Sequence, residues 1–257
     1  MPITKLRKDN NNYYITARRG FNPTIQLNNE VLSKVFEFSY GMSFGKSGEH
    51  RSYRSGGQRS RRNGELFINT LQGKLAEYGA YQSIVNCGIS ELNEPDLDTW
   101  ELGEWDQTDI ECCGLKLNVK STKSFGNLLL LETKDWDENG HYIPNIDKEG
   151  KGQYDLFLLT RVSPDGERLM KYNRLYFSDV LPGGEKELRN IINEEKWEFD
   201  IAGIVSKDIL KQIISEKFIL PQNAMLNGKV RMDAENYYIQ AGDMIPATDL
   251  NELLNRN

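Results

Sequence analysis

The chain has 257 residues, enough to bury a full core as one domain or as one domain with a small appendage. Hydrophobic residues make up 38% and charged residues 27% of it, and no apolar run approaches the ~18 residues that a membrane span needs, so no membrane protein is expected. Three cysteines, two of them adjacent, and two histidines give neither a disulfide framework nor a zinc-ligand spacing. With no secretory signal evident, we expect a protein of the reducing cytoplasm.

The N-terminal quarter predicts one helix and little else. Residues 1–28 are polar and irregular, and Asn10 to Asn12 are expected to form a loop or a disordered stretch. Residues 29–41 repeat apolar side chains close to a helical period. Gly45-Lys46-Ser47 resembles the end of a phosphate-binding loop, but Tyr40 stands where the first glycine is needed, so no nucleotide cofactor is expected.

A basic segment follows, rich in Gly and Ser and without an apolar period, which predicts a loop that is mobile when free. Although the net charge of the chain is −6, residues 46–62 carry six basic residues against one acidic residue, and residues 91–111 carry nine acidic residues and no basic one. Affinity for a duplex depends on local neutralisation of phosphates, so the segment fits either DNA contact or a solvated linker, and we favour DNA contact because of the resemblance described below for the residues that follow it. The candidate DNA-binding residues are Lys46, Arg51, Arg54, Arg59, Arg61 and Arg62.

The rest of the chain alternates helical and extended patterns. Helices are expected over 66–85, 185–194 and 206–217 and from residue 248 onward, and strands over 125–131, 153–163, 169–177, 197–205 and 232–240. The strand at 153–163 is apolar throughout and should be buried on both faces. This mixed order predicts an α/β or α+β fold with a mixed central β-sheet flanked by helices.

Residues 108–122 are the most informative stretch, because polar and apolar residues alternate about Gly114 as in a tight β-hairpin. A turn at Cys113-Gly114 places Asp109 opposite Asn118, and a turn one residue later places it opposite Lys120. Either register puts all three polar side chains on one face. Oxygen ligands beside an ammonium could serve a metal-dependent phosphodiesterase, since Mg²⁺ prefers oxygen and lysine can orient the attacking water. The pattern alone fits an ordinary amphipathic hairpin equally well.

Asp109 followed by Asn118-Val119-Lys120 resembles the active-site hairpin of the PD-(D/E)XK nuclease superfamily, in particular its type II restriction endonucleases. The similarity covers roughly residues 64–162 as a helix, a hairpin and a strand, with Glu77 matching the glutamate that often joins the site from a preceding helix. It implies a restriction-endonuclease-like core over 63–257, with 1–62 as a DNA-contacting part of the same domain. It further implies Mg²⁺ as cofactor, double-stranded DNA as substrate, and a homodimer matching a palindromic site.

The chain departs from the family at Asn118, where an acidic residue is usual. An amide oxygen can ligate Mg²⁺ but brings no charge. Three explanations stay open: Asn118 suffices with Glu77 completing the site, Glu111 supplies a carboxylate, or the site is inactive. Asp106 is a secondary candidate for the first acidic ligand. The corresponding functions are a site-specific endonuclease, a structure-directed repair nuclease on the same core, or a sequence-specific DNA-binding protein on a decayed core.

Overall fold

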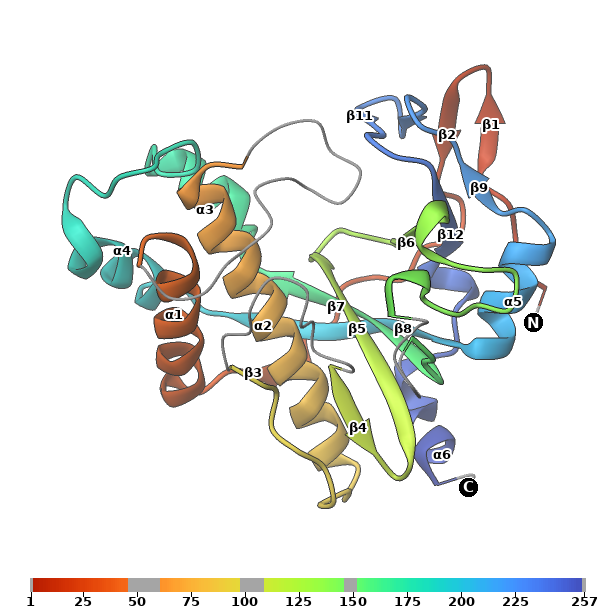
Figure 1. Ribbon diagram of the computed structural model, residues 1–257, viewed down its shortest axis with the longest axis horizontal. Helices are drawn as coiled ribbons and strands as arrows, with labels where there is room; N and C mark the ends of the chain where they lie inside the picture. The colour runs from red at the N-terminus through yellow and green to blue at the C-terminus, as the bar shows by residue number, and fades with distance from the viewer. Residues whose placement is uncertain (1, 46–60, 98–108, 146–151, 256–257) are drawn as a thin grey trace.

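The computed structural model describes residues 2–45, 61–97, 109–145 and 152–255. Its centre is a five-stranded mixed sheet in the order β3-β8-β7-β5-β4, in which only the β5–β7 pair is parallel (Figure 1). The strands, in that order, are Ile25–Gln26, Glu198–Ser206, Leu156–Ser163, Leu115–Lys123 and Ile110–Cys112. The expected mixed sheet with flanking helices is therefore confirmed at this level.

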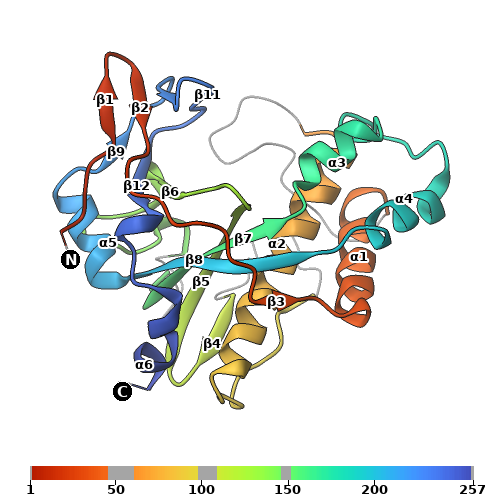
Figure 2. The ribbon, with the colours of Figure 1, turned by 180° about the vertical axis from the view of Figure 1, so that it is seen from behind.

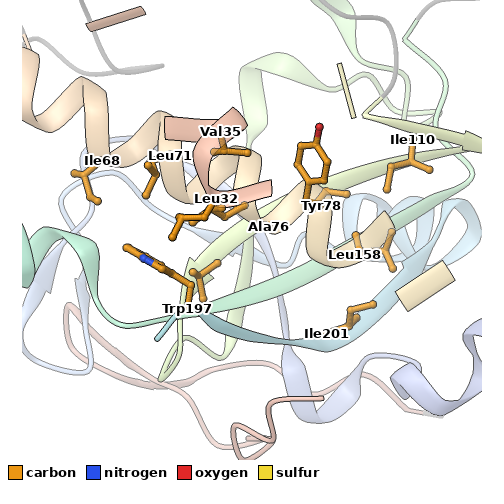
Figure 3. Packing of buried hydrophobic residues seen from close by; sticks show 14 of the residues in the cluster. Leu32, Val35, Ile68, Leu71, Ala76, Tyr78, Ile110, Leu158, Trp197 and Ile201 are labelled. Atoms are coloured by element: carbon orange, nitrogen blue, oxygen red, sulfur yellow. The ribbon is translucent and has the colours of Figure 1, made fainter. Parts of the chain in front are cut away.

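Helices cover one face of the central sheet, as Figures 1 and 2 show from opposite sides. α2 packs on β5, β7 and β8, and α1 packs on α2. The elements on this side are α1 (Asn29–Ser43), α2 (Asn63–Asn86), α3 (Gly166–Tyr172) and α4 (Gly184–Asn193). Figure 3 shows the buried cluster between them and the strands, to which Leu32, Leu71 and Ala76 of the helices and Leu158 and Ile201 of the strands belong.

A second layer covers the other face. It consists of a three-stranded sheet in the order β6-β12-β9 together with α5, and it encloses a separate apolar cluster with Phe157 and Leu159 of β7. The bounds are β6 (Leu128–Glu132), β12 (Asn236–Gln240), β9 (Ile219–Leu220) and α5 (Lys207–Ser215). Ser206 caps α5 by accepting the N–H of Ile209 at 3.3 Å, which confirms the expected helix start.

A small four-stranded sheet, β1-β2-β10-β11, joins the N-terminal hairpin to residues 225–231. Its strands are Arg7–Asp9, Asn12–Tyr14, Met225–Leu226 and Val230–Arg231. The chain ends in short 3-10 turns and α6 (Leu250–Leu254). No helix in the described ranges is long and apolar enough to cross a bilayer.

Two predictions of local structure are wrong. The expected strand at 169–177 is instead α3, because Asp165 accepts the N–H of Arg168 at 3.3 Å and caps a helix that buries Met170 against the core. The expected irregular N-terminus contains β1, β2 and β3, since β2 and β3 pair with β10 and β8 far along the chain and β1 pairs with β2. Neither the cap of α3 nor the pairing of the N-terminal strands can be predicted from the spacing of apolar residues.

Candidate active site

The candidate site is built on the β4–β5 hairpin, and the structure selects one of the two registers. Ile110 pairs with Leu117 and Cys112 with Leu115, so the turn residues are Cys113 and Gly114. Both have positive φ, 51° and 73°, as a two-residue turn that matches strand twist requires. Continuing this register by one pair places Asp109 opposite Asn118.

The alternation of the hairpin separates its two faces. Ile110, Leu117 and Val119 are buried in the cluster under α2. Asn118 and Lys120 therefore point to the other face, where β7 pairs them with Phe157 and Leu159, both members of the second cluster. The two polar side chains share a face, as expected from the sequence.

Asp109 lies just before β4, and its carboxylate is held at the edge of β5. Its Oδ2 accepts the backbone N–H of Val119 at 2.6 Å. Val119 stands between Asn118 and Lys120, so this bond fixes the carboxylate beside the residue pair that the sequence singled out. The bond also satisfies a strand donor beyond the end of β4, which gives Asp109 a structural role in addition to any chemistry.

Asn118 carries the unusual feature of the site. The residue is only 6% exposed, and its Oδ1 atom has no hydrogen-bond partner in the part of the chain that the structure describes. Buried polar atoms in folded proteins nearly always have a partner, because an unsatisfied one costs about 1–3 kcal/mol. The orphaned oxygen is thus a fixed acceptor suited to a cation or a water molecule.

Lys120 is partly buried two residues further along the same face. No carboxylate lies within ion-pair distance of its ammonium among the described residues. No acidic side chain in the described ranges neutralises the ammonium. Lys120 lies two residues after Asn118 on β5, on the same face as the unpartnered amide oxygen. This is the arrangement in which a lysine can orient a water or stabilise charge on a phosphate oxygen.

The two further candidate ligands lie elsewhere. Glu77 belongs to α2, on the face of the sheet opposite to Asn118, and its carboxylate forms an ion pair with Lys74 at 2.8 Å. Glu111 is exposed and pairs with Lys116 across the hairpin, not with Asn118. The described residues contain no group of three His, Cys, Asp or Glu side chains that could hold a metal.

Of the candidate ligands, the two that lie at neighbouring positions of β5 are the carboxylate of Asp109, held at the N–H of Val119, and the amide oxygen of Asn118. This pair fits Mg²⁺, which commonly binds proteins through one or two oxygen ligands and completes its octahedron with water and substrate phosphate. This pair of oxygen donors is poorly suited to Zn²⁺, which prefers nitrogen and sulfur ligands.

Most of the expected DNA-contacting segment cannot be placed. Lys46, Arg51, Arg54 and Arg59 lie outside the described residues, as does Asp106. Arg61 is partly buried at the start of α2, and the exposed Arg62 forms an ion pair with Asp179. The ion pair of Arg62 therefore helps to fix the N-terminus of α2.

The sequence reasoning missed a buried ion pair between β7 and β8, on the same face of the sheet as Asn118 and Lys120. Arg161 is 1% exposed and binds both carboxylate oxygens of Asp200, at 2.8 and 2.6 Å. It also donates to the carbonyls of Arg19 and Gly20, which fastens the N-terminal segment to β7 and β8. The pair borders a cavity of about 440 Å³. A lone arginine inside an otherwise apolar strand pattern was the available signal.

Comparisons with known proteins add no relative: no family model, no curated protein and no solved structure matches this chain.

Proposed function

We propose that the chain is a Mg²⁺-dependent endonuclease that hydrolyses double-stranded DNA, most specifically a type II restriction enzyme. The observation that carries this proposal is the buried Oδ1 of Asn118, which lacks a described partner and lies on the same face as Lys120, with the carboxylate of Asp109 fixed at the neighbouring backbone amide. Buried polar atoms without a partner are uncommon in folded proteins, which makes this oxygen a candidate ligand position.

In the proposed reaction Asp109 and Asn118 would hold Mg²⁺ through their side-chain oxygens. When bound, the ion would neutralise the phosphodiester and lower the pKa of an attacking water. Lys120 donates hydrogen bonds that orient this water and stabilise the charge that grows on the phosphate oxygens. The second layer over Phe157 and Leu159 supplies an apolar floor, in which these electrostatic contacts are stronger than in water.

The placement of Glu77 and Glu111 bears on the alternatives that the sequence left open. Glu77 lies across the sheet and Glu111 faces Lys116, so the proposed site relies on Asn118 itself. With one such site per chain, cutting both strands of a duplex requires two copies, and we include a homodimer in the proposal.

The decisive experiment incubates the purified protein with long, sequence-diverse, unmethylated duplex DNA, with and without Mg²⁺, at about 50 mM salt, where phosphate contacts are strong. Discrete fragments that appear only with Mg²⁺ are expected. A smear would indicate a structure-directed or nonspecific nuclease. Retarded but intact DNA would indicate a binding protein on a decayed core.

Two variants and one matched control sharpen the result. Asp109→Asn and Lys120→Ala should each lower the cleavage rate by a factor of about 100 or more, as loss of one electrostatic group in a catalytic site typically does. Lys116→Ala removes an ammonium from the same strand and the same face, and cleavage should persist. Equal activity of the Lys116 and Lys120 variants would overturn the assigned role of Lys120.

A further inference from the structure

The small four-stranded sheet presents a projecting hairpin. β1 is its edge strand, exposed along its whole length, and it is joined to β2 by the two-residue turn Asn10-Asn11. Figures 1 and 2 both show this hairpin standing clear of the central sheet at one end of the molecule, next to β11. Asn10 has φ of 52°, a conformation that asparagine tolerates better than most residues.

The two faces of this sheet differ in chemistry. Tyr13 is 8% exposed and anchors one face in the second apolar cluster. The neighbouring positions Asn12 and Tyr14 therefore belong to the outer face. On this face Arg7 pairs with Tyr14. Met225 pairs with Asn12 on one side and with Arg231 on the other, so these three residues form one row across the sheet. The outer face thus carries guanidinium, amide and phenol groups, together with the carboxylate of Asp9 opposite Asn12.

Basic residues outnumber acidic ones on this sheet, where Asp9 is the acidic residue of β1. Arg7, Lys8, Lys229 and Arg231 are all exposed, and none forms an ion pair with a carboxylate anywhere in the described ranges. By contrast, other exposed or partly exposed bases do, as in the Arg189–Glu37 pair at 2.6 Å. In a chain of net charge −6, residues 1–20 hold five basic residues and one acidic residue.

Two of the guanidinium groups are held in place by neutral partners. Arg7 lies over the ring of Tyr14, 4.7 Å from its centroid. Arg231 donates from Nε and Nη2 to Oδ1 of Asn223, at 3.0 and 2.7 Å. Side chains that are already oriented lose less entropy on binding. Because the partners of Arg7 and Arg231 are neutral, both guanidinium groups keep their full positive charge for an anionic partner.

We propose that the β1–β2 hairpin enters the major groove of duplex DNA, with Arg7 and Asn12 at the base edges and Arg231 on the phosphate backbone. The major groove admits a two-stranded β-ribbon, arginine matches the O6/N7 edge of guanine, and asparagine matches the N6/N7 edge of adenine. This inference rests on the proposed function in taking DNA as the partner. It assigns sequence reading to a part of the chain that is separate in sequence from the basic segment.

The test measures binding of the full-length protein, without Mg²⁺, to duplex oligonucleotides with a randomised centre, over a series of salt concentrations. Binding by Arg7→Ala/Arg231→Ala should weaken about tenfold or more, and the slope of log K against log[salt] should shrink by about 1 to 2. Asn12→Ala should change the sequences that are retained and leave the salt slope unchanged. Thermal melting of each variant excludes misfolding as the cause.

Lys186→Ala/Lys196→Ala is the matched control, since it removes two positive charges near α4, at the other end of the molecule in Figure 1. If the hairpin variant binds like this control, the hairpin assignment is overturned, even if cleavage by the wild-type protein is intact. Binding that is lost in the hairpin variant while the wild type never cleaves DNA supports the hairpin and overturns the endonuclease. A wild-type protein that binds no duplex overturns both.

Discussion

At the scale of single residues, Asn118 shows how stability and function can oppose each other. Its amide oxygen is buried on the face that adjoins Phe157, with no hydrogen-bond partner among the described residues. A side chain kept for stability alone would be apolar at this position, as Phe157 beside it is. The residue is therefore where substitution should separate folding from activity.

We expect Asn118→Leu to abolish cleavage and to leave the free energy of unfolding unchanged or to raise it by about 1–2 kcal/mol, because leucine has a similar size and removes the unsatisfied oxygen. Urea denaturation and the cleavage assay measure the two effects. Asn118→Asp keeps an oxygen ligand and should retain cleavage. A loss of stability larger than about 2 kcal/mol in the leucine variant would show that the amide has a structural partner.

At the scale of elements, α2 is positioned by close backbone approach at its first turn. The N–H of Gly64 donates to the carbonyl of Ser178 at 2.9 Å. A Cβ atom on Gly64 would lie 1.8 Å from the carbonyl oxygen of Leu175, whereas one on Gly73, in the same helix, would meet nothing within 4 Å. Two glycines that look alike in the sequence thus have different reasons to be there.

Gly64→Ala should lower the free energy of unfolding by about 1–3 kcal/mol, because the methyl group collides with backbone that cannot move aside. Gly73→Ala should raise it by up to about 1 kcal/mol through better helix propensity. Thermal and chemical denaturation of both variants check this pair. Similar shifts in the two variants would contradict the packing assigned to the start of α2.

At the scale of the whole molecule, a charge network joins the end of β5 to α3. Lys123 lies 2.7 Å from Glu167 and 3.2 Å from Asp165, and Lys171 also bonds Glu167. Burial by itself raises the pKa of Glu167, but the hydrogen bonds from Lys123 and Lys171 outweigh it and lower the pKa from 4.5 to about 2. The ionised form is thus favoured in the folded state.

This shift fixes the direction of a pH effect on global stability. Because the folded pKa of Glu167 lies below the unfolded value, its stabilisation is complete above pH 4.5 and is lost as the pH falls towards 2. In that window the free energy of unfolding of the wild type should fall more steeply than that of Glu167→Gln. Glu138→Gln, at an exposed position, is the control and should follow the wild type. If the free energies of unfolding of the wild type and of Glu167→Gln fell equally with pH in this window, the stabilising role assigned to the charge network would be wrong.

The sequence by itself determined the elements whose signal is local. The apolar run at 153–163 became the buried strand β7, the helical periods became α1, α2 and α4, and the alternation about Gly114 became a hairpin with Asn118 and Lys120 on one face. These features depend on side chains within a few residues of one another, so their periods reveal them.

Only the tertiary structure decided what depends on partners distant in sequence. It chose the register of the hairpin, put Glu77 across the sheet from Asn118, left Oδ1 of Asn118 without a described partner, and buried Arg161 against Asp200. It also paired β2 with β10, which created the projecting hairpin from residues that look irregular in the sequence. The physical reason is that strand pairing and burial follow from long-range contacts, which no local period encodes.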